Sequence, residues 1–165
     1  MTPRWKPSTT VAAVIEQQGR FLLVEEQTPE GLMLNNPAGH LEAGESPEQG
    51  VAREVMEETG CVFTPQALVG IYLSRFHRIA THEDVTYMRL AYCGHASAPT
   101  PGWVLDDGIV RTLWLTPTEI RASAARHRSP LVLQCMENYL AGQRYPLNLV
   151  QTDASVYSPD IKRPT

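Results

Sequence analysis

Two short apolar stretches near the N-terminus have the composition of β-strands. Thr10–Ile15 and Phe21–Val24 are rich in β-branched and other apolar residues, and the polar segment Gln17–Arg20 between them contains Gly19. This arrangement predicts a hairpin in which the two stretches pair with each other. Leu32–Leu34 is a further extended piece, and the proline and glycine that follow it indicate a loop.

The clearest helix signals come after this loop. Ser46 is a favourable N-cap, Pro47 suits the first helical position, and Gln49 completes a capping box with Ser46. Gly60 is a typical residue for ending a helix. We therefore predict a helix over Pro47–Thr59.

The rest of the chain mixes strand-like and helix-like segments without a regular βαβ alternation. The predicted strands are Leu68–Phe76, Val85–Cys93 and Val110–Leu115, with a loop over Ala96–Gly108, and the predicted helices open at Thr116 and at Ser129, the second ending near Gly142. We expect a single α/β (α+β) domain over residues 1–150 with a mixed β-sheet between helices. Residues 151–165 are expected to form a loose C-terminal tail.

Composition narrows the class of protein. The 165 residues are 42% hydrophobic and 19% charged, as in ordinary globular domains, and the net charge of −4 gives no support to a nucleic-acid-binding surface. No stretch approaches the ~20 apolar residues that a membrane helix needs. Cys61, Cys93 and Cys135 are odd in number and lack CxxC spacing, which favours core packing over disulfides or zinc. We expect a cytoplasmic protein without nucleic-acid or membrane partners, and a monomer rather than a dimer.

Three glutamates share one face of the predicted helix. Glu54, Glu57 and Glu58 stand at positions i, i+3 and i+4, and two of them lie in the last turn, where the helix dipole favours cations. The three carboxylates repel one another, and a divalent cation would remove that repulsion. Taken alone, the pattern is equally compatible with a solvated acidic helix face.

The spacing to residues before the helix decides between these interpretations. The chain contains the pattern G-x5-E-x7-R-E-x2-E-E-x-G, which begins at Gly39, passes through Glu45 and Arg53, and ends at Gly60. On these residues the sequence resembles the Nudix hydrolase family. Cys61 departs from the aliphatic residue usual in the family, and this difference concerns packing rather than chemistry.

The resemblance implies a fold, a reaction and a cofactor. It implies the Nudix α/β/α sandwich, hydrolysis of a small-molecule diphosphate by water, and Mg²⁺, with Mn²⁺ able to substitute. Glu54, Glu57 and Glu58 are the implied catalytic residues, and together with the carbonyl of Gly39 they are the implied metal ligands. One of these glutamates, or an acid from another loop, would deprotonate the water. Glu45 and Arg53 are expected to form an ion pair that fixes the helix against the loop.

Acidic residues elsewhere could supply an additional ligand or base. Asp106 and Asp107 lie in the loop before Val110–Leu115, where many Nudix enzymes place a further acid, and we choose Asp107 as the additional metal ligand. Glu83 and Asp84 are interpreted as turn residues.

Two further residues are candidates for binding substrate. His40 follows Gly39 directly and would contact a phosphate or serve only as a loop residue. Arg89 stands in the middle of a predicted strand, where an unpaired charge is costly to bury. It is expected to pair with an acid or to bind a substrate phosphate, and we favour phosphate.

Similarity outside the motif points to a bacterial subgroup of Nudix phosphatases. It is carried by Asn36–Ala43, Arg128–Val132 and Gly142–Leu147. The subgroup removes phosphate from nucleoside di- and triphosphates, from thiamine pyrophosphate and from its pyrimidine (HMP) precursor diphosphate. Arg144 and Tyr145 would then bind a phosphate and stack on a substrate ring, although Tyr145 could instead pack the last helix onto the sheet.

Other functions compatible with the motif remain as alternatives. A housecleaning pyrophosphohydrolase of oxidised nucleotides or ADP-ribose would share the metal-binding helix. A non-catalytic nucleotide sensor would be expected to lose carboxylates that this chain retains. An enzyme acting on RNA ends conflicts with the acidic charge balance.

Overall fold

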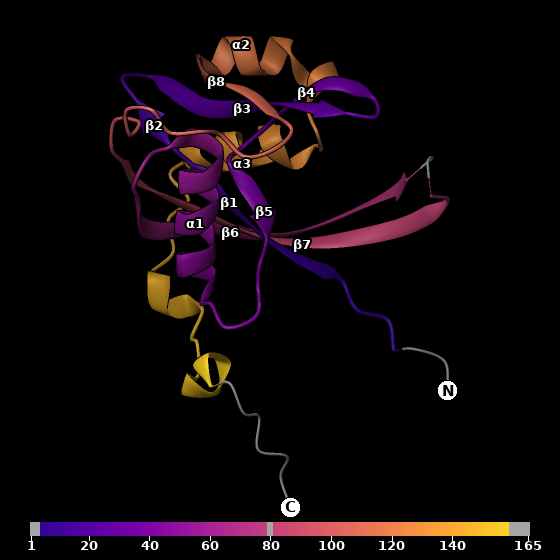
Figure 1. The fold of residues 1–165 in the computed structure, drawn as a ribbon, viewed down its shortest axis with the longest axis vertical. Helices are drawn as coiled ribbons and strands as arrows, with labels where there is room; N and C mark the ends of the chain where they lie inside the picture. The colour runs from indigo at the N-terminus through magenta and orange to yellow at the C-terminus, as the bar shows by residue number, and fades with distance from the viewer. Residues whose placement is uncertain (1–3, 79–80, 159–165) are drawn as a thin grey trace, which may run out of the picture.

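The computed structural model describes residues 4–78 and 81–158. These residues form two β-sheets with helices packed around them (Figure 1). One sheet has the strand order β5-β1-β7-β6, and the other has the order β2-β3-β4, with β8 paired to β3. The elements are β1 (Ser8–Val14), β2 (Glu16–Gln17), β3 (Arg20–Thr28), β4 (Gly31–Asn35), β5 (Ala38–His40), α1 (Pro47–Thr59), β6 (Phe63–Arg78), β7 (Glu83–Ala96), β8 (Ile109–Leu115), α2 (Pro117–Ala122), η1 (Ala124–Arg126), α3 (Leu131–Leu140), η2 (Leu147–Leu149) and η3 (Ala154–Tyr157).

Strand β1 runs through the centre of the fold and is buried on both faces. Val11 belongs to a buried cluster that includes Val55 of α1, whereas the next residue, Ala12, belongs to a second cluster that includes Val132 of α3. Successive side chains of a strand point to opposite faces, so α1 and α3 cover opposite sides of this sheet. Because β1 is parallel to β7 and antiparallel to β5, the expected mixed sheet between helices is confirmed.

The predicted hairpin turn over Gln17–Arg20 is confirmed, because β2 pairs with β3 across it, with positive φ angles at Gln18 (52°) and Gly19 (76°). Of the first predicted stretch only Ile15 joins this pairing, by accepting a hydrogen bond from the Leu22 amide, and the predicted pairing of the rest of that stretch is wrong. Strand β1 takes its partners from β5 and β7, and β3 takes β4 and β8. Local composition marks both stretches as strands, but the partners that cover a strand buried on both faces come from distant parts of the chain.

The first helix has the bounds that its capping residues predict. The Ser46 side chain accepts a hydrogen bond from the Gln49 amide, and the Gln49 side chain accepts one from the Ser46 amide. Gly60 ends the helix in the left-handed conformation, with φ 71°. These caps fix where the helix begins and ends relative to the loop from β5.

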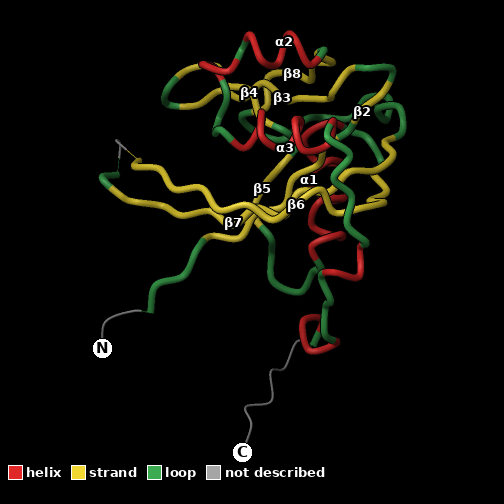
Figure 2. Tube along the Cα trace, turned by 180° about the vertical axis from the view of Figure 1, so that it is seen from behind, coloured by secondary structure: helices red, strands yellow, loops and turns green. Residues whose placement is uncertain are grey.

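Strands β6 and β7 are longer than predicted and form a hairpin whose far end projects from the body of the molecule (Figures 1 and 2). We call the described part of this end, residues 74–78 and 83–87, the ribbon. The prediction stopped short because the strand ends carry arginine, histidine and acidic side chains instead of an alternating apolar pattern.

The chain after α3 follows the body before reaching the tail. The backbone of Tyr145 pairs with that of Leu68 in β6, and Leu147 packs against a buried cluster. Within the predicted C-terminal tail, Asp153 caps the short 3-10 helix η3, and no residue of this helix is buried. Residues 159–165 of the predicted tail lie outside the described residues.

Candidate active site

The loop from β5 meets α1 at Gly39. A Cβ atom on Gly39 would stand only 2.2 Å from Oε1 of Glu54. At position 39, only glycine therefore allows the Glu54 carboxylate to lie directly against the loop backbone. The glycine of the sequence motif is explained by this close approach.

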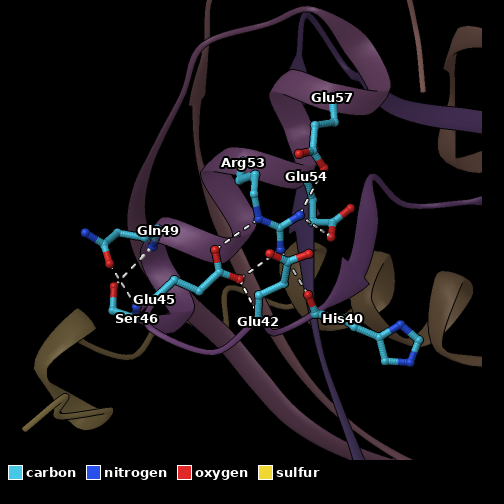
Figure 3. Close-up of polar contacts among 8 residues, drawn as sticks. All are labelled: His40, Glu42, Glu45, Ser46, Gln49, Arg53, Glu54 and Glu57. Atoms are coloured by element: carbon cyan, nitrogen blue, oxygen red, sulfur yellow. Dashed lines mark hydrogen bonds and ion pairs between the residues drawn. The ribbon is translucent and has the colours of Figure 1, made fainter. Parts of the chain in front are cut away.

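Arg53 joins the loop to the glutamates of α1 (Figure 3). Its Nε and Nη2 donate to the two carboxylate oxygens of Glu45, at 3.0 and 2.8 Å, and Nη2 also donates to the carbonyl of His40 at 3.0 Å. Its Nη1 donates to Glu54 at 2.8 Å and to Glu57 at 2.9 Å. The hydrogen bonds from Arg53 hold the pKa of Glu45 below its ordinary value. Arg53 thus fixes the loop, Glu54 and Glu57 in one arrangement.

Two of the three glutamates are buried instead of facing solvent. Glu54 is 8% exposed and Glu58 is 7% exposed. Burial raises the pKa of Glu54 despite its hydrogen bond from Arg53. Burial also raises the pKa of Glu58 to about 9, because the single backbone hydrogen bond from Ala38, at 2.9 Å, offsets little of the lost solvation, and Glu26, Glu54 and Asp106 add negative charge nearby. The face of α1 that packs inward therefore carries two carboxylates.

A cavity of about 320 Å³ opens beside these residues. Its wall combines residues of the sequence motif with others from distant segments. The charged and aromatic residues that line it are Glu26, His40, Glu58, Phe76, Tyr87, Arg89, Asp107 and Arg128, and the Gly39 backbone completes this side. Glu54 and Glu57 are not among the lining residues, so within the motif Glu58, Gly39 and His40 face the cavity.

Arg89 carries a buried positive charge into the same cavity. It is 7% exposed, and its Nη atoms donate long hydrogen bonds of 3.3 and 3.4 Å to the side-chain oxygens of Asn35 and Asn36. Burial lowers its pKa. In the described part of the chain no carboxylate lies within ion-pair distance of Arg89. Of the two expectations for this arginine, pairing with an acid is wrong.

The remaining acids of the sequence prediction divide between the cavity and the ribbon. Asp107 lines the cavity, and its neighbour Asp106 donates a backbone hydrogen bond to the carbonyl of Glu57 at 3.0 Å. Glu83 and Asp84 are the first residues of β7 instead of turn residues. Asp84 pairs with Arg75, whose hydrogen bond holds the pKa of Asp84 below its ordinary value.

The structure does not bring Arg144 and Tyr145 to this cavity. The Arg144 guanidinium lies 3.7 Å from the centre of the Tyr139 ring and donates to the carbonyls of Tyr139 and Gln143. Tyr145 exchanges backbone hydrogen bonds with Leu68, because the chain after α3 runs along β6. Substrate binding by this pair stays a prediction to which the cavity adds no support.

Glu26 and the aromatic residues of the ribbon were missed by the sequence interpretation. Glu26 accepts a hydrogen bond from the Asn35 side chain at 3.0 Å and lies 3.6 Å from Nε of Arg128. The register of β3 on β8 shifts between Glu25 and Glu26. Two adjacent acids at the end of an apolar strand were the available signal for Glu26, whereas nothing in the local pattern distinguishes Phe76 and Tyr87.

Comparison with known proteins agrees with this fold. The NUDIX domain family model matches residues 5–135, and the chain belongs to the Nudix family. It is a hydrolase of phosphorus-containing acid anhydrides. Among known relatives, the chain is 36% identical over 146 residues to Phosphatase NudJ from Escherichia coli strain K12. The aligned residues make up 88% of this chain and 92% of the relative.

Solved structures give the same family. A NUDIX hydrolase from Nitrosomonas europaea is 50% identical, with a TM-score of 0.81, covering 90% of this chain and 98% of that one. The NUDIX domain of Shewanella oneidensis NrtR, solved with ADP ribose, is 17% identical, with a TM-score of 0.65 over 84% of this chain and 90% of that one, and shows a shared fold. Among the described residues, no helix has the length and apolar character needed to cross a membrane.

Proposed function

We propose that this Nudix hydrolase is a magnesium-dependent phosphatase that releases inorganic phosphate from nucleoside di- and triphosphates and from thiamine-type pyrophosphates. The sequence identity of 36% with Phosphatase NudJ, over most of both chains, supports the phosphatase activity. The observation that carries the proposal is that a buried carboxylate, Glu58, and a buried guanidinium, Arg89, line the same cavity without forming an ion pair.

The donor groups beside the cavity suit a magnesium ion. They are glutamate carboxylates and the Gly39 carbonyl, which are the hard oxygen ligands that Mg²⁺ prefers. In the described residues no three acidic, histidine or cysteine side chains converge as a preformed metal cage. Mg²⁺ does not require one, because it keeps several waters and takes substrate phosphates as ligands. Glu54, Glu57 and Glu58 with the Gly39 carbonyl would hold the ion, and it would neutralise diphosphate charge.

The protein's own residues supply the remaining chemistry. Arg89 binds a phosphate oxygen, since a buried guanidinium whose bonds to Asn35 and Asn36 are long, and whose other hydrogen-bonding neighbour is the Cys135 thiol, retains donors for a charged ligand. Asp107, which lines the cavity, would be a further ligand of the ion, and either this residue or one of the glutamates would accept the proton of the attacking water. Arg53 keeps Glu54 and Glu57 in place without touching the substrate.

We propose that the protein acts as a monomer. Turnover per chain is then expected to be independent of protein concentration in a dilution series, and turnover that falls on dilution would contradict this proposal.

Replacing Glu58 tests the assignment. We expect Glu58→Gln to lower the turnover of thiamine pyrophosphate and GTP by roughly two orders of magnitude, because an amide does not replace a carboxylate as a ligand of Mg²⁺. Phosphate release in the presence of Mg²⁺ is the measurement. Glu48→Gln, in the first turn of the same helix and not at the cavity, is the matched control. Wild-type turnover by Glu58→Gln would overturn the assignment.

A further inference from the structure

The β6–β7 hairpin presents different side chains on its two faces. Phe76 of β6, together with Tyr87 and Arg89 of β7, lines the cavity. The alternate residues Ile71 and Leu73 belong to the other face, where they are 53% and 68% exposed. Since side chains alternate along a strand, the register of the hairpin places the aromatic rings and the buried arginine on one face.

The aromatic rings form a continuous wall at the outer part of the cavity. The rings of Phe76 and Tyr87 are stacked with centroids 5.4 Å apart and planes at 12°. The ring of His40 lies 5.9 Å from that of Tyr87, at 52°. Figure 3 shows this imidazole pointing away from Arg53, while the His40 carbonyl accepts the hydrogen bond from that side chain. Phe76 is 39% exposed, so part of its surface is available to a ligand.

The order of residues along β7 places a charged end and an aromatic end at different positions in the cavity. Tyr87 stands two residues before Arg89 on the same face, which corresponds to about 6.6 Å along a strand. The cation and the carboxylate of Glu58 therefore mark a phosphate end of the cavity, and the aromatic wall marks an apolar end. A ligand with a diphosphate joined through a short linker to a planar ring matches this order.

Mutual packing alone does not account for this wall. A stacked pair stabilises neighbouring strands wherever it occurs. Here the pair lies at the cavity, while the outer face of the same hairpin carries the exposed aliphatic residues Ile71 and Leu73 and the ion pair of Arg75 with Asp84. The aromatic residues are thus on the side where a ligand's ring would be, next to the charges that would hold its phosphates.

We propose that Phe76 and Tyr87, with His40 at their edge, form a stacking subsite for the planar heterocycle of the substrate. The inference rests on the proposed function for the phosphate end, and it deepens that function by naming what selects the substrate. Nucleobases and the pyrimidine of thiamine-type diphosphates are the ring class that this wall accepts, since every such ring has a π-face.

The test compares a ligand with a ring and one without. Phe76→Leu and Tyr87→Leu are measured for phosphate release from GDP and from inorganic tripolyphosphate, and for binding of the non-hydrolysable α,β-methylene analogue of GDP by calorimetry in Mg²⁺. Tyr87→Phe keeps the ring and removes the hydroxyl that pairs with Arg78. Leu73→Ala, on the other face of the hairpin, is the control, and melting temperatures establish that each variant is folded.

Each leucine variant is expected to raise KM for GDP and Kd for the methylene analogue by about tenfold, the size expected for loss of one ring stack, with kcat little changed. KM for tripolyphosphate should stay within about twofold, and Leu73→Ala should behave as wild type. Tyr87→Phe, which keeps the ring, should weaken GDP binding much less than Tyr87→Leu. Equal weakening for both ligands, or no weakening, would overturn the subsite.

The binding measurement separates this proposal from the proposed function. If the wild-type protein releases no phosphate but the analogue binds and the leucine variants weaken its binding, the phosphatase assignment fails and the subsite stands. If the wild-type protein binds neither the methylene analogue nor thiamine diphosphate, the subsite is wrong.

Discussion

Two buried side chains that can carry a charge, Glu58 and Arg89, explain most of the chemistry inferred for this protein. Glu58 and Arg89 are both nearly excluded from solvent, where an isolated charge is costly. Glu58 has one backbone hydrogen bond, and Arg89 has two long amide contacts. A metal ion and a phosphate are the ligands that would compensate these two charges.

Gly39 offers a test of geometry at the same scale. We expect Gly39→Ala to lower turnover at least tenfold, because its Cβ would displace the Glu54 carboxylate, which stands 2.2 Å from that position. The free energy of unfolding should fall by only about 1–2 kcal/mol, since the displaced atoms end a side chain. Steady-state kinetics and urea denaturation measure the two effects.

A double-mutant cycle tests why Gly39→Ala lowers turnover. If Gly39→Ala acts by displacing Glu54, its effect on turnover should be much smaller in a Glu54→Ala background. Additive losses in the double variant would show that the alanine acts through another route.

At the scale of elements, one buried carboxylate paired with two half-exposed arginines holds the walls of the cavity together. Glu25 of β3, whose side chain is 3% exposed, pairs with Arg111 of β8 at 2.8 Å and with Arg126 of η1. The next residue, Glu26, faces the cavity. The pairing therefore fixes β8 and η1 around the strand that supplies a cavity carboxylate.

The stability of this group should depend on pH. Hydrogen bonds from Arg111, and then from Arg126, hold the pKa of Glu25 below its ordinary value of 4.5. A carboxyl whose pKa is depressed by folding stabilises the protein above the unfolded value, and this stabilisation is lost as pH falls through the folded value. We expect Glu25→Gln to cost about 1–3 kcal/mol at pH 7.

Urea denaturation at a series of pH values measures this effect. The difference between wild type and Glu25→Gln should shrink as the pH falls below 4.5. Arg121 pairs with Glu137 at the surface, so Glu137→Gln is a control expected to cost less than the Glu25 variant. A Glu25 effect that stays constant down to acid pH would contradict the ionic account.

At the scale of the whole molecule, local signals predicted elements better than their assembly. The capping residues of α1 gave both of its ends, because each cap acts within one turn of the helix. The pairing of β1 was mispredicted, since its register with β7 joins residues such as Val11 and Leu90 that are far apart in the chain.

The candidate site shows the same difference between what local sequence patterns predict and what depends on the tertiary fold. Glu58, Gly39 and His40 lie in one continuous stretch of sequence, so the family resemblance that its spacing carries predicted that they belong to one site. Glu26 and Tyr87 reach the cavity from other strands, and no local pattern places them there. A cavity wall built from distant strands is a property of the tertiary fold.

The identity of the phosphorus-containing product tests the central claim most directly. Phosphorus NMR of wild-type reactions with thiamine pyrophosphate and with GTP in Mg²⁺ distinguishes orthophosphate from pyrophosphate. We predict orthophosphate as the first product from both substrates, with turnover abolished when EDTA removes the metal. Pyrophosphate as the first product from GTP, or turnover that persists in EDTA, would contradict a magnesium-dependent phosphatase.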